Sequence, residues 1–300
     1  FILAAANYSI YNSYWSKLLK FINKLPEEIQ TSEKWTYWKG KAFCKISDKE
    51  MCKLTLTNLS LKRSYYGFIA ANILDKPINI VNIPYEVSDD ELNEFSSKIE
   101  IKRIYELLAL GKKREARKEL SYLYENSKYT NLNTLNILFH NWGWSQGAIL
   151  GYGYTKYFDD IRLRFPVLYE NYFDKYSNSN IEKILLYGIA RKESIFIQYA
   201  KSSAGALGIM QILPKTSYWV LKKAKMKKVS RNYLYNKNMN IFIGSYYFKY
   251  LFSKKKSYVE AIASYNAGPN AVSRWRALNK APEDAWIEYI PYDETRRYVK

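Results

Sequence analysis

One stretch, from Glu193 to Thr216, is the most informative part of the chain. It reads Glu-Ser-Ile-Phe-Ile-Gln-Tyr-Ala-Lys-Ser-Ser-Ala-Gly-Ala-Leu-Gly-Ile-Met-Gln-Ile-Leu-Pro-Lys-Thr. A carboxylate comes first, a loop of small residues follows, and the amide Gln211 stands shortly before a proline. No Asp or Glu occurs between Glu193 and Glu260. Acid–base chemistry in this stretch would therefore depend on one local carboxyl group.

The segment before this carboxyl group predicts a helix that ends close to it. Ile181, Leu185 and Ile189 recur at every fourth residue. Glu193 is the next member of the same row, so its side chain is expected to point at the body of the protein or into a cleft. A carboxyl group in such surroundings keeps its proton more readily and can act as a general acid. The alternative is a solvated glutamate at a helix end.

The loop that follows the acid has very little side-chain bulk. It runs from Ser202 to Gly208 as Ser-Ser-Ala-Gly-Ala-Leu-Gly. Gly205 and Gly208 permit backbone conformations that other residues avoid, and they let a ligand approach the main chain. Backbone polar groups of such a loop can hydrogen-bond a sugar or its N-acetyl group. A glycine-rich loop alone is weak support for a site.

A second polar corner is expected near residue 265. The sequence from Ala263 to Pro269 is Ala-Ser-Tyr-Asn-Ala-Gly-Pro, which predicts a helix that ends at Tyr265 and another that begins at the proline. Gly268 suits a positive φ between the two helices. Tyr265 and Asn266 then lie at the corner, where a tyrosine ring can stack on a sugar face. An ordinary well-formed turn is the alternative.

The last motif follows a proline near the end of the chain. It runs from Ile290 to Tyr298 as Ile-Pro-Tyr-Asp-Glu-Thr-Arg-Arg-Tyr. The pattern predicts a helix after the proline that carries Glu294, Arg297 and Tyr298.

Taken together, these four segments resemble the soluble lytic murein transglycosylase family, whose catalytic domain has a lysozyme-like, goose-type fold. The family pattern is Glu-Ser, then Gly-Ala-x-Gly-[Leu/Ile]-Met-Gln, then Tyr-Asn-Ala-Gly-Pro, then Ile-Pro-x-x-Glu-Thr-Arg-x-Tyr-Val. All four occur here in that order. The combination is highly specific, although each piece alone is not.

The resemblance implies a role for individual residues. Glu193 stands at the position of the catalytic acid/base. The positions that line the cleft, support the acid or belong to the substrate-binding motifs are Ser202, Met210, Gln211, Tyr265, Asn266, Glu294 and Tyr298. The sequence departs from the family at two places: Ile197-Gln198 replaces the usual Asn-Pro, and Leu213 replaces a common cleft methionine. The first departure affects the path of the loop, and the second affects contacts with the saccharide.

The rest of the chain reads as helical, and its first part resembles the helical superhelix of the long soluble family members. Residues 54–71 predict one helix, residues 74–87 a loop with two prolines, and Gly111 the turn of a helical hairpin. The expected fold is mostly α: a helical superhelix or solenoid and linker helices, followed by a lysozyme-like, mainly helical catalytic domain. The expected ranges are 1–85 for the superhelical part, 86–163 for the linker and 164–300 for the catalytic domain.

Composition narrows the classes of function. The formal net charge of +19 favours a polyanionic partner such as an acidic wall polymer, an anionic lipid surface or nucleic acid, although a codon bias towards Lys, Asn, Ile and Tyr explains it equally well. No apolar run reaches 18 residues, so no transmembrane segment is expected. With one His and two Cys, a His-rich zinc site is excluded. We expect no metal and no cofactor.

The two cysteines, Cys44 and Cys52, flank an expected connection between helices. A disulfide is geometrically possible there. We expect it in an oxidising compartment and not in a cytosol. The chain starts at Phe1 and stops at Lys300 inside a helix-like run, so we expect a fragment or a chain trimmed at both ends, and a missing signal peptide says nothing about secretion.

The expected activity is that of a peptidoglycan lytic transglycosylase, a lyase that cleaves the bond between N-acetylmuramic acid and N-acetylglucosamine and leaves a 1,6-anhydro ring. The expected partner is the peptidoglycan glycan strand in the periplasm, with a monomeric enzyme and no nucleic acid. The alternatives are a goose-type lysozyme-like hydrolase and a non-catalytic cell-wall-binding scaffold. For the hydrolase, a second acid would come from Asp159, Asp160, Asp174 or Glu294.

Overall fold

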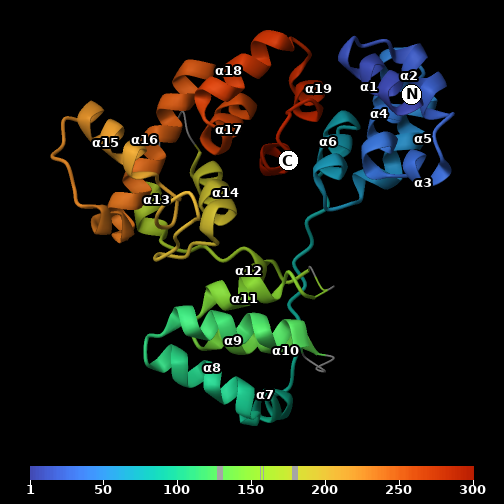
Figure 1. Cartoon of the computed structure of the whole chain (residues 1–300). Coiled ribbons are helices and arrows are strands. Elements are labelled where there is room, and N and C mark those ends of the chain that lie inside the picture. The colour runs from blue at the N-terminus through green and yellow to red at the C-terminus, as the bar shows by residue number, and fades with distance from the viewer. Residues whose placement is uncertain (127–130, 156, 158, 178–181) are drawn as a thin grey trace. The chain divides into compact units, whose positions relative to one another are not determined.

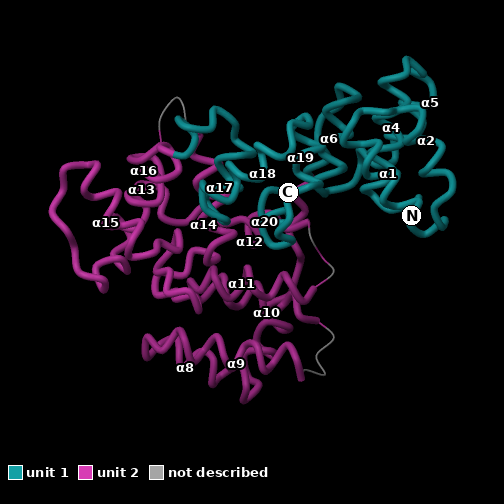
Figure 2. Tube along the Cα trace, turned by 45° about the horizontal axis from the view of Figure 1, so that its top comes forward, with its two compact units in different colours: residues 1–80, 251–300 teal, residues 81–250 magenta. Residues whose placement is uncertain are grey.

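The computed structural model describes residues 1–126, 131–155, 157, 159–177 and 182–300. Helices are the main secondary structure of these residues, and the extended pairings among them are two isolated bridges, Lys201 with Leu207 and Leu207 with Ile212. The predicted mostly α fold is therefore confirmed. The chain forms two compact units, residues 1–80 with 251–300 and residues 81–250 (Figure 2). The three sequence ranges expected for the domains differ from these units and stay a prediction.

Unit 1 contains the helices at both ends of the chain (Figure 1). They are α1 (Ile2–Tyr11), α2 (Trp15–Ile22), α3 (Glu27–Gln30), α4 (Glu33–Lys45), α5 (Lys49–Ser60), α6 (Tyr65–Ile73), α17 (Tyr258–Ala267), α18 (Pro269–Leu278), α19 (Glu283–Glu288) and α20 (Asp293–Val299).

A large apolar core holds the first helices of unit 1 together. Its fully buried side chains include Leu18 and Ile22 of α2, Trp38 of α4 and Leu56 of α5. Within each helix the buried residues recur at a spacing of three or four, as in Trp35, Trp38 and Ala42 of α4, which places them on its inner face. The turn between α4 and α5 is closed by the disulfide between Cys44 and Cys52.

A smaller core joins the last helices to α6 within the same unit. Ala263, Val272, Trp286 and Ile290 are buried in it, and Tyr65 at the start of α6 packs against them. Residues that are about 200 positions apart in the chain therefore share one core. This packing places the corner around residue 266 on a rigid support.

One element of unit 1 differs from the prediction. Residues 54–71 do not form a single helix, because α5 ends at Ser60 and α6 begins at Tyr65. The side chain of Ser64 accepts a hydrogen bond from the Gly67 amide, which caps the new helix. A Cβ atom at Gly67 would lie 2.0 Å from the Lys62 carbonyl oxygen, so the tight break needs a glycine. The apolar spacing continues through the break, which is why the sequence pattern conceals it.

Unit 2 contains the intervening helices (Figure 1). They are α7 (Asp89–Ser97), α8 (Ile99–Ala109), α9 (Lys113–Asn126), α10 (Leu132–Asn141), α11 (Ser145–Gly151), α12 (Ile161–Arg164), α13 (Glu170–Tyr176), α14 (Lys183–Ser194), α15 (Pro214–Lys223), the short 3-10 helix η1 (Arg231–Tyr235) and α16 (Lys237–Lys255), whose last residues belong to unit 1.

The hairpin of α8 and α9 forms as predicted. Gly111 follows α8 with a φ of +71°, and its amide donates to the Leu108 carbonyl at 2.9 Å. Ile104 of α8 and Leu120 of α9 are buried in a shared core with Phe139 of α10. No helix in the described part of the chain is long and apolar enough to cross a membrane.

Candidate active site

The predicted acid lies at the end of a helix. Glu193 is the next-to-last residue of α14 and is half-buried. Its row contains Ile189, which is buried, and Leu185, which is half-buried, whereas Ile181 lies outside the described residues. Glu193 therefore continues a row of buried and half-buried apolar side chains on α14, as expected, as far as the structure describes that row.

Ser194 fixes the end of this helix to the glycine-rich loop. Its buried hydroxyl donates to the Ile209 carbonyl at 2.7 Å and accepts from the Ile197 amide at 3.1 Å. These two bonds join the residue after the acid to the far side of the loop. Removal of the hydroxyl would leave both backbone groups without this partner.

The backbone after the acid turns in an unusual way. Ile195 and Phe196 both have a positive φ, +54° and +60°, which costs non-glycine residues of order 1–3 kcal/mol each. Phe196 is 2% exposed and its ring packs against Phe173. Its carbonyl accepts from the Gln146 amide and from the Tyr169 hydroxyl, each at 3.4 Å. Burial and hydrogen bonding of Phe196 offset the strain of this backbone conformation.

The glycine-rich loop is shaped by Ser202. The Ser202 hydroxyl accepts from the Ala206 amide at 3.0 Å, and the Ser202 amide donates to the Ala206 carbonyl at 3.0 Å. Gly205, between them, has a φ of +81°. Ser202 therefore closes a tight turn of the loop with both its side chain and its main chain.

Gln211 and Met210 occupy different surroundings. Gln211 is half-buried with a φ of +47°, and its side-chain amide donates to the Gly208 carbonyl at 2.8 Å. Met210 is fully buried. A Cβ atom at Gly244 of α16 would lie 2.4 Å from the Met210 sulfur, so that glycine makes room for it. This burial favours a supporting role for Met210.

Asn240 is a residue of this site that the sequence did not reveal. It is 1% exposed on α16, where its side chain accepts from the Met210 amide at 2.7 Å. It also donates to the carbonyls of Leu207 at 2.9 Å and Leu234 at 2.8 Å. One amide side chain thus satisfies three buried backbone groups and holds the loop against α16. No motif surrounds it, so only its long-range contacts identify it.

The second predicted corner forms in unit 1. α17 ends at Ala267, two residues later than expected, and Gly268 follows with a φ of +85°. The Asn266 amide donates to the exposed Glu294 carboxylate at 3.3 Å, and Asn266 accepts from the Thr295 hydroxyl at 2.6 Å. Thr295, almost fully buried, is a further residue that sequence reasoning missed. Tyr265 and Tyr298 are both half-buried.

The eight predicted residues thus fall into two groups of four. Glu193, Ser202, Met210 and Gln211 belong to unit 2, and Tyr265, Asn266, Glu294 and Tyr298 belong to unit 1. The first group lies at the end of α14 and on the glycine-rich loop, and the second lies at the end of α17 and on α20. The joint action of the two groups on one substrate stays a prediction.

Two regions of the chain match known protein domains. Residues 170–287 match the transglycosylase SLT domain, and residues 95–161 match the L domain of soluble lytic murein transglycosylases. A putative soluble lytic murein transglycosylase of Haemophilus influenzae is 31% identical over 292 residues, which cover 95% of this chain and 48% of the relative. The chain belongs to the soluble lytic murein transglycosylase family.

Other relatives agree with this assignment to the transglycosylase family. The soluble lytic murein transglycosylase of Escherichia coli strain K12 is 30% identical over 291 residues, with 93% of this chain and 44% of the relative covered. The solved structure of an inactive glutamate-to-glutamine mutant of lytic transglycosylase Slt from Pseudomonas aeruginosa has a TM-score of 0.91 and 27% identity, and covers 98% of this chain and 48% of that one. The chain spans about half the length of the relatives it matches.

Two of the four candidates for the second acid of a hydrolase, Asp160 and Asp174, have ion-pair partners. Asp160 is fully buried, where it accepts from the Tyr85 amide at 3.1 Å and pairs with Arg162. Asp174 pairs with Lys183 at 2.7 Å. Asp160 is therefore held in place by structural partners, whereas the pair of Asp174 and Lys183 lies at the surface.

Proposed function

We propose that this chain carries the catalytic part of a peptidoglycan lytic transglycosylase, a carbon–oxygen lyase that acts on a polysaccharide. The observation that carries the proposal is Glu193, half-buried at the end of α14 beside a loop that Ser194 and Asn240 hold in place. Membership of a murein transglycosylase family supports the same activity.

Glu193 serves as acid and then as base in the proposed reaction. Its carboxyl group protonates the glycosidic oxygen between N-acetylmuramic acid and N-acetylglucosamine, while the substrate's own N-acetyl group stabilises the cationic carbon. The carboxylate then accepts the proton of the muramic C6 hydroxyl, which attacks C1 and closes a 1,6-anhydro ring. No water is consumed. One carboxyl group is sufficient, unlike the pair that ordinary glycosidases use.

The remaining predicted residues bind or position the glycan. Backbone groups of the loop around Gly205 can accept and donate hydrogen bonds to the saccharide, and Ser202 keeps that loop closed. The ring of Tyr265 offers a stacking surface, and Asn266 orients the Glu294 carboxylate. Peptidoglycan strands in the periplasm are the proposed substrate, and a monomer is the proposed active form.

Product chemistry tests this function. Purified peptidoglycan is digested with the chain, and the released muropeptides are identified by mass spectrometry. We expect 1,6-anhydromuramyl products, which are one water lighter than hydrolysis products. Glu193→Gln should lower the rate at least about 10²-fold, because general acid–base catalysis typically contributes ~10²–10⁴-fold.

A matched variant controls for effects on the helix itself. Glu182→Gln makes the same chemical change at the other end of α14, where the side chain is exposed, and should keep full activity. Reducing-end products would indicate the lysozyme-like hydrolase instead. Glu193→Gln with near-native turnover would show that another residue is the acid. Wall binding without any product would favour the scaffold.

A further inference from the structure

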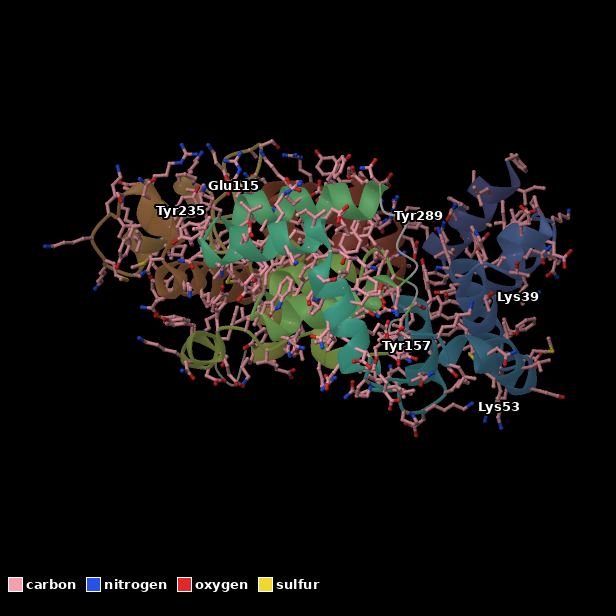
Figure 3. The ribbon with its side chains drawn as sticks, turned by 90° about the horizontal axis from the view of Figure 1, so that it is seen from below. Lys39, Lys53, Glu115, Tyr157, Tyr235 and Tyr289 are labelled. Atoms are coloured by element: carbon pink, nitrogen blue, oxygen red, sulfur yellow. A yellow bond between two sulfur atoms is a disulfide. The ribbon has the colours of Figure 1, made fainter. Side chains whose placement is uncertain are left out.

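Unit 2 contains a cavity of ≈ 730 Å³ that the proposed reaction does not use. Its walls come from the first turns of α9, from α11 and the residue before it, from Tyr169 before α13, from the segment 197–201, and from the connection between η1 and α16. Glu115 and Tyr235 lie on two of these walls and near one another in Figure 3. Ligand sites in proteins usually measure ~300–1,000 Å³. None of the eight predicted site residues lines this cavity.

The lining is strongly basic. The lining contains five cationic side chains and one carboxylate, that of Glu115, so its net charge is +4. The cations are Lys113, Arg114, Arg117, Lys201 and Lys237. In the described part of the chain, none of these cations forms an ion pair with a carboxylate. α9 also begins here, and the positive end of its dipole adds to the field. This positive charge favours the binding of an anionic ligand.

Aromatic rings line the same cavity. Tyr199 is 71% exposed, and its ring centroid lies 5.6 Å from that of Tyr235. The Lys237 ammonium group lies 5.0 Å from the centre of the Tyr169 ring. Tyrosine rings have an apolar face that packs on the C–H groups of a sugar and a hydroxyl that hydrogen-bonds its oxygens. Rings and cations side by side therefore favour a ligand with both a ring and negative charge.

Gln198 connects two walls of the cavity. Ile197 and Gln198, which replace the usual Asn-Pro, both line the cavity. The Gln198 side chain donates to the Tyr235 carbonyl at 3.0 Å, so it ties the wall after the acid to the end of η1. A proline at position 198 has no side-chain donor for this bond. The departure thus helps to build the cavity.

We propose that this cavity is a second binding site, and that it takes an anionic saccharide. The sugar ring lies against the tyrosines, and its carboxylate or phosphate groups bind the lysines and arginines. Single-stranded nucleic acid also binds cations and aromatic rings, but it tracks along an extended groove. A cavity of limited volume favours the smaller ligand.

Binding is measured by isothermal titration calorimetry with the full 300-residue chain. The two anionic probes are trigalacturonate, which supplies carboxylates, and glucose 1,6-bisphosphate, which supplies phosphates; chitotriose is the neutral control. We expect one or both anionic probes to bind and chitotriose to bind at least about tenfold more weakly. The stronger anionic probe identifies the preferred group. Failure of both anionic probes to bind would overturn the proposal.

Variants locate the bound probe. Lys201→Ala/Lys237→Ala and Tyr199→Ala should each weaken binding by about tenfold or more, the loss expected for a charge-assisted hydrogen bond or a stacked ring. Tyr199→Phe should retain most of the affinity, because the ring remains. Lys222→Ala/Lys223→Ala removes the same charge from exposed positions on α15 outside the cavity and should leave binding unchanged.

Two outcomes of this comparison would contradict the site. An equal loss in the α15 pair would mean diffuse attraction to a basic surface. A short oligonucleotide that binds more tightly than the saccharides and depends on Tyr199 would make the cavity a nucleic-acid site. Glu193→Gln should bind the probe as the parent chain does, so this site can be tested even if the proposed catalytic function fails.

Discussion

At the scale of single residues, the two glycines of the loop differ in what surrounds them. Both have a positive φ, +81° at Gly205 and +77° at Gly208. A Cβ atom at Gly208 would lie 2.4 Å from the Asn240 amide nitrogen and 2.7 Å from the Leu234 carbonyl oxygen. At Gly205 the nearest atom is the end of the Arg231 side chain, 3.3 Å away. Packing and backbone conformation therefore both require a glycine at position 208, whereas at position 205 the requirement comes mainly from backbone conformation.

We expect Gly208→Ala to lower the free energy of unfolding by about 2–4 kcal/mol, because backbone strain adds to overpacking against α16. Gly205→Ala should cost only about 1 kcal/mol, since the arginine side chain can move aside. Urea denaturation followed by circular dichroism measures both values. Equal losses in the two variants would mean that the contact with Asn240 is unimportant.

The sequence predicts those features of the candidate site that depend on neighbouring residues. Glu193 follows from its row on one helix, and Gly268 follows from the turn around it. Asn240 and Thr295 cannot be found in this way, because their partners are distant in the chain: Asn240 binds the backbone 30 residues earlier, and Thr295 binds a side chain 29 residues earlier. Such contacts depend on tertiary packing, which no short motif records.

At the scale of helices and turns, capping residues were the reliable signals. Gly111 ends the turn after α8, as predicted, and Ser88 accepts from the Glu91 amide at the start of α7. The apolar spacing was less reliable, since it continues across the break between α5 and α6. Periodicity indicates which face of a helix is buried, but it does not show where one helix stops and another starts.

The turn between α4 and α5 gives a prediction at this scale. The disulfide between Cys44 and Cys52 spans eight positions. Restriction of the unfolded chain by a loop of this size stabilises the fold by about 2–3 kcal/mol. Reduction with dithiothreitol should therefore shift urea denaturation to lower urea concentration by the equivalent amount.

Cys44→Ser/Cys52→Ser provides the control for this experiment. The chain has no other cysteine, so dithiothreitol should leave the stability of the double variant unchanged. A parent chain whose stability is the same with and without the reductant would show that the bond contributes nothing.

At the scale of the whole molecule, charged and phenolic groups connect the two ends of the chain within unit 1. Asp284 of α19 accepts from the Tyr37 hydroxyl of α4 at 2.8 Å and pairs with Lys41. Glu288 accepts from the Tyr66 hydroxyl at 2.7 Å. It also pairs with Lys34 and Lys300. None of these pairings was visible in the sequence, because charge pattern along a chain does not say which distant helices meet.

Burial raises the pKa of Asp284, but hydrogen bonding and charge from Lys41 outweigh it, so the pKa lies below its usual 3.8. Burial likewise raises the pKa of Glu288, but Lys34 and Lys300 hold it below 4.5. Because the folded-state pKa values are lowered, both carboxylates stabilise the fold above about pH 4.5, and this contribution is lost as the pH falls through the folded-state values.

Unfolding free energies measured by urea denaturation between pH 7 and pH 3 test this linkage. The parent chain should lose up to about 1.4 kcal/mol per pH unit for each carboxyl group as the pH falls below about 4.5. Asp284→Asn and Glu288→Gln should be less stable at pH 7 and should each show a shallower loss in acid. Asp75→Asn, which removes an exposed carboxylate from the same unit, should follow the parent curve. If the stability of all four proteins fell with the same slope below about pH 4.5, other groups would control acid unfolding. These contacts between the first and last helices would then add no pH-dependent stability.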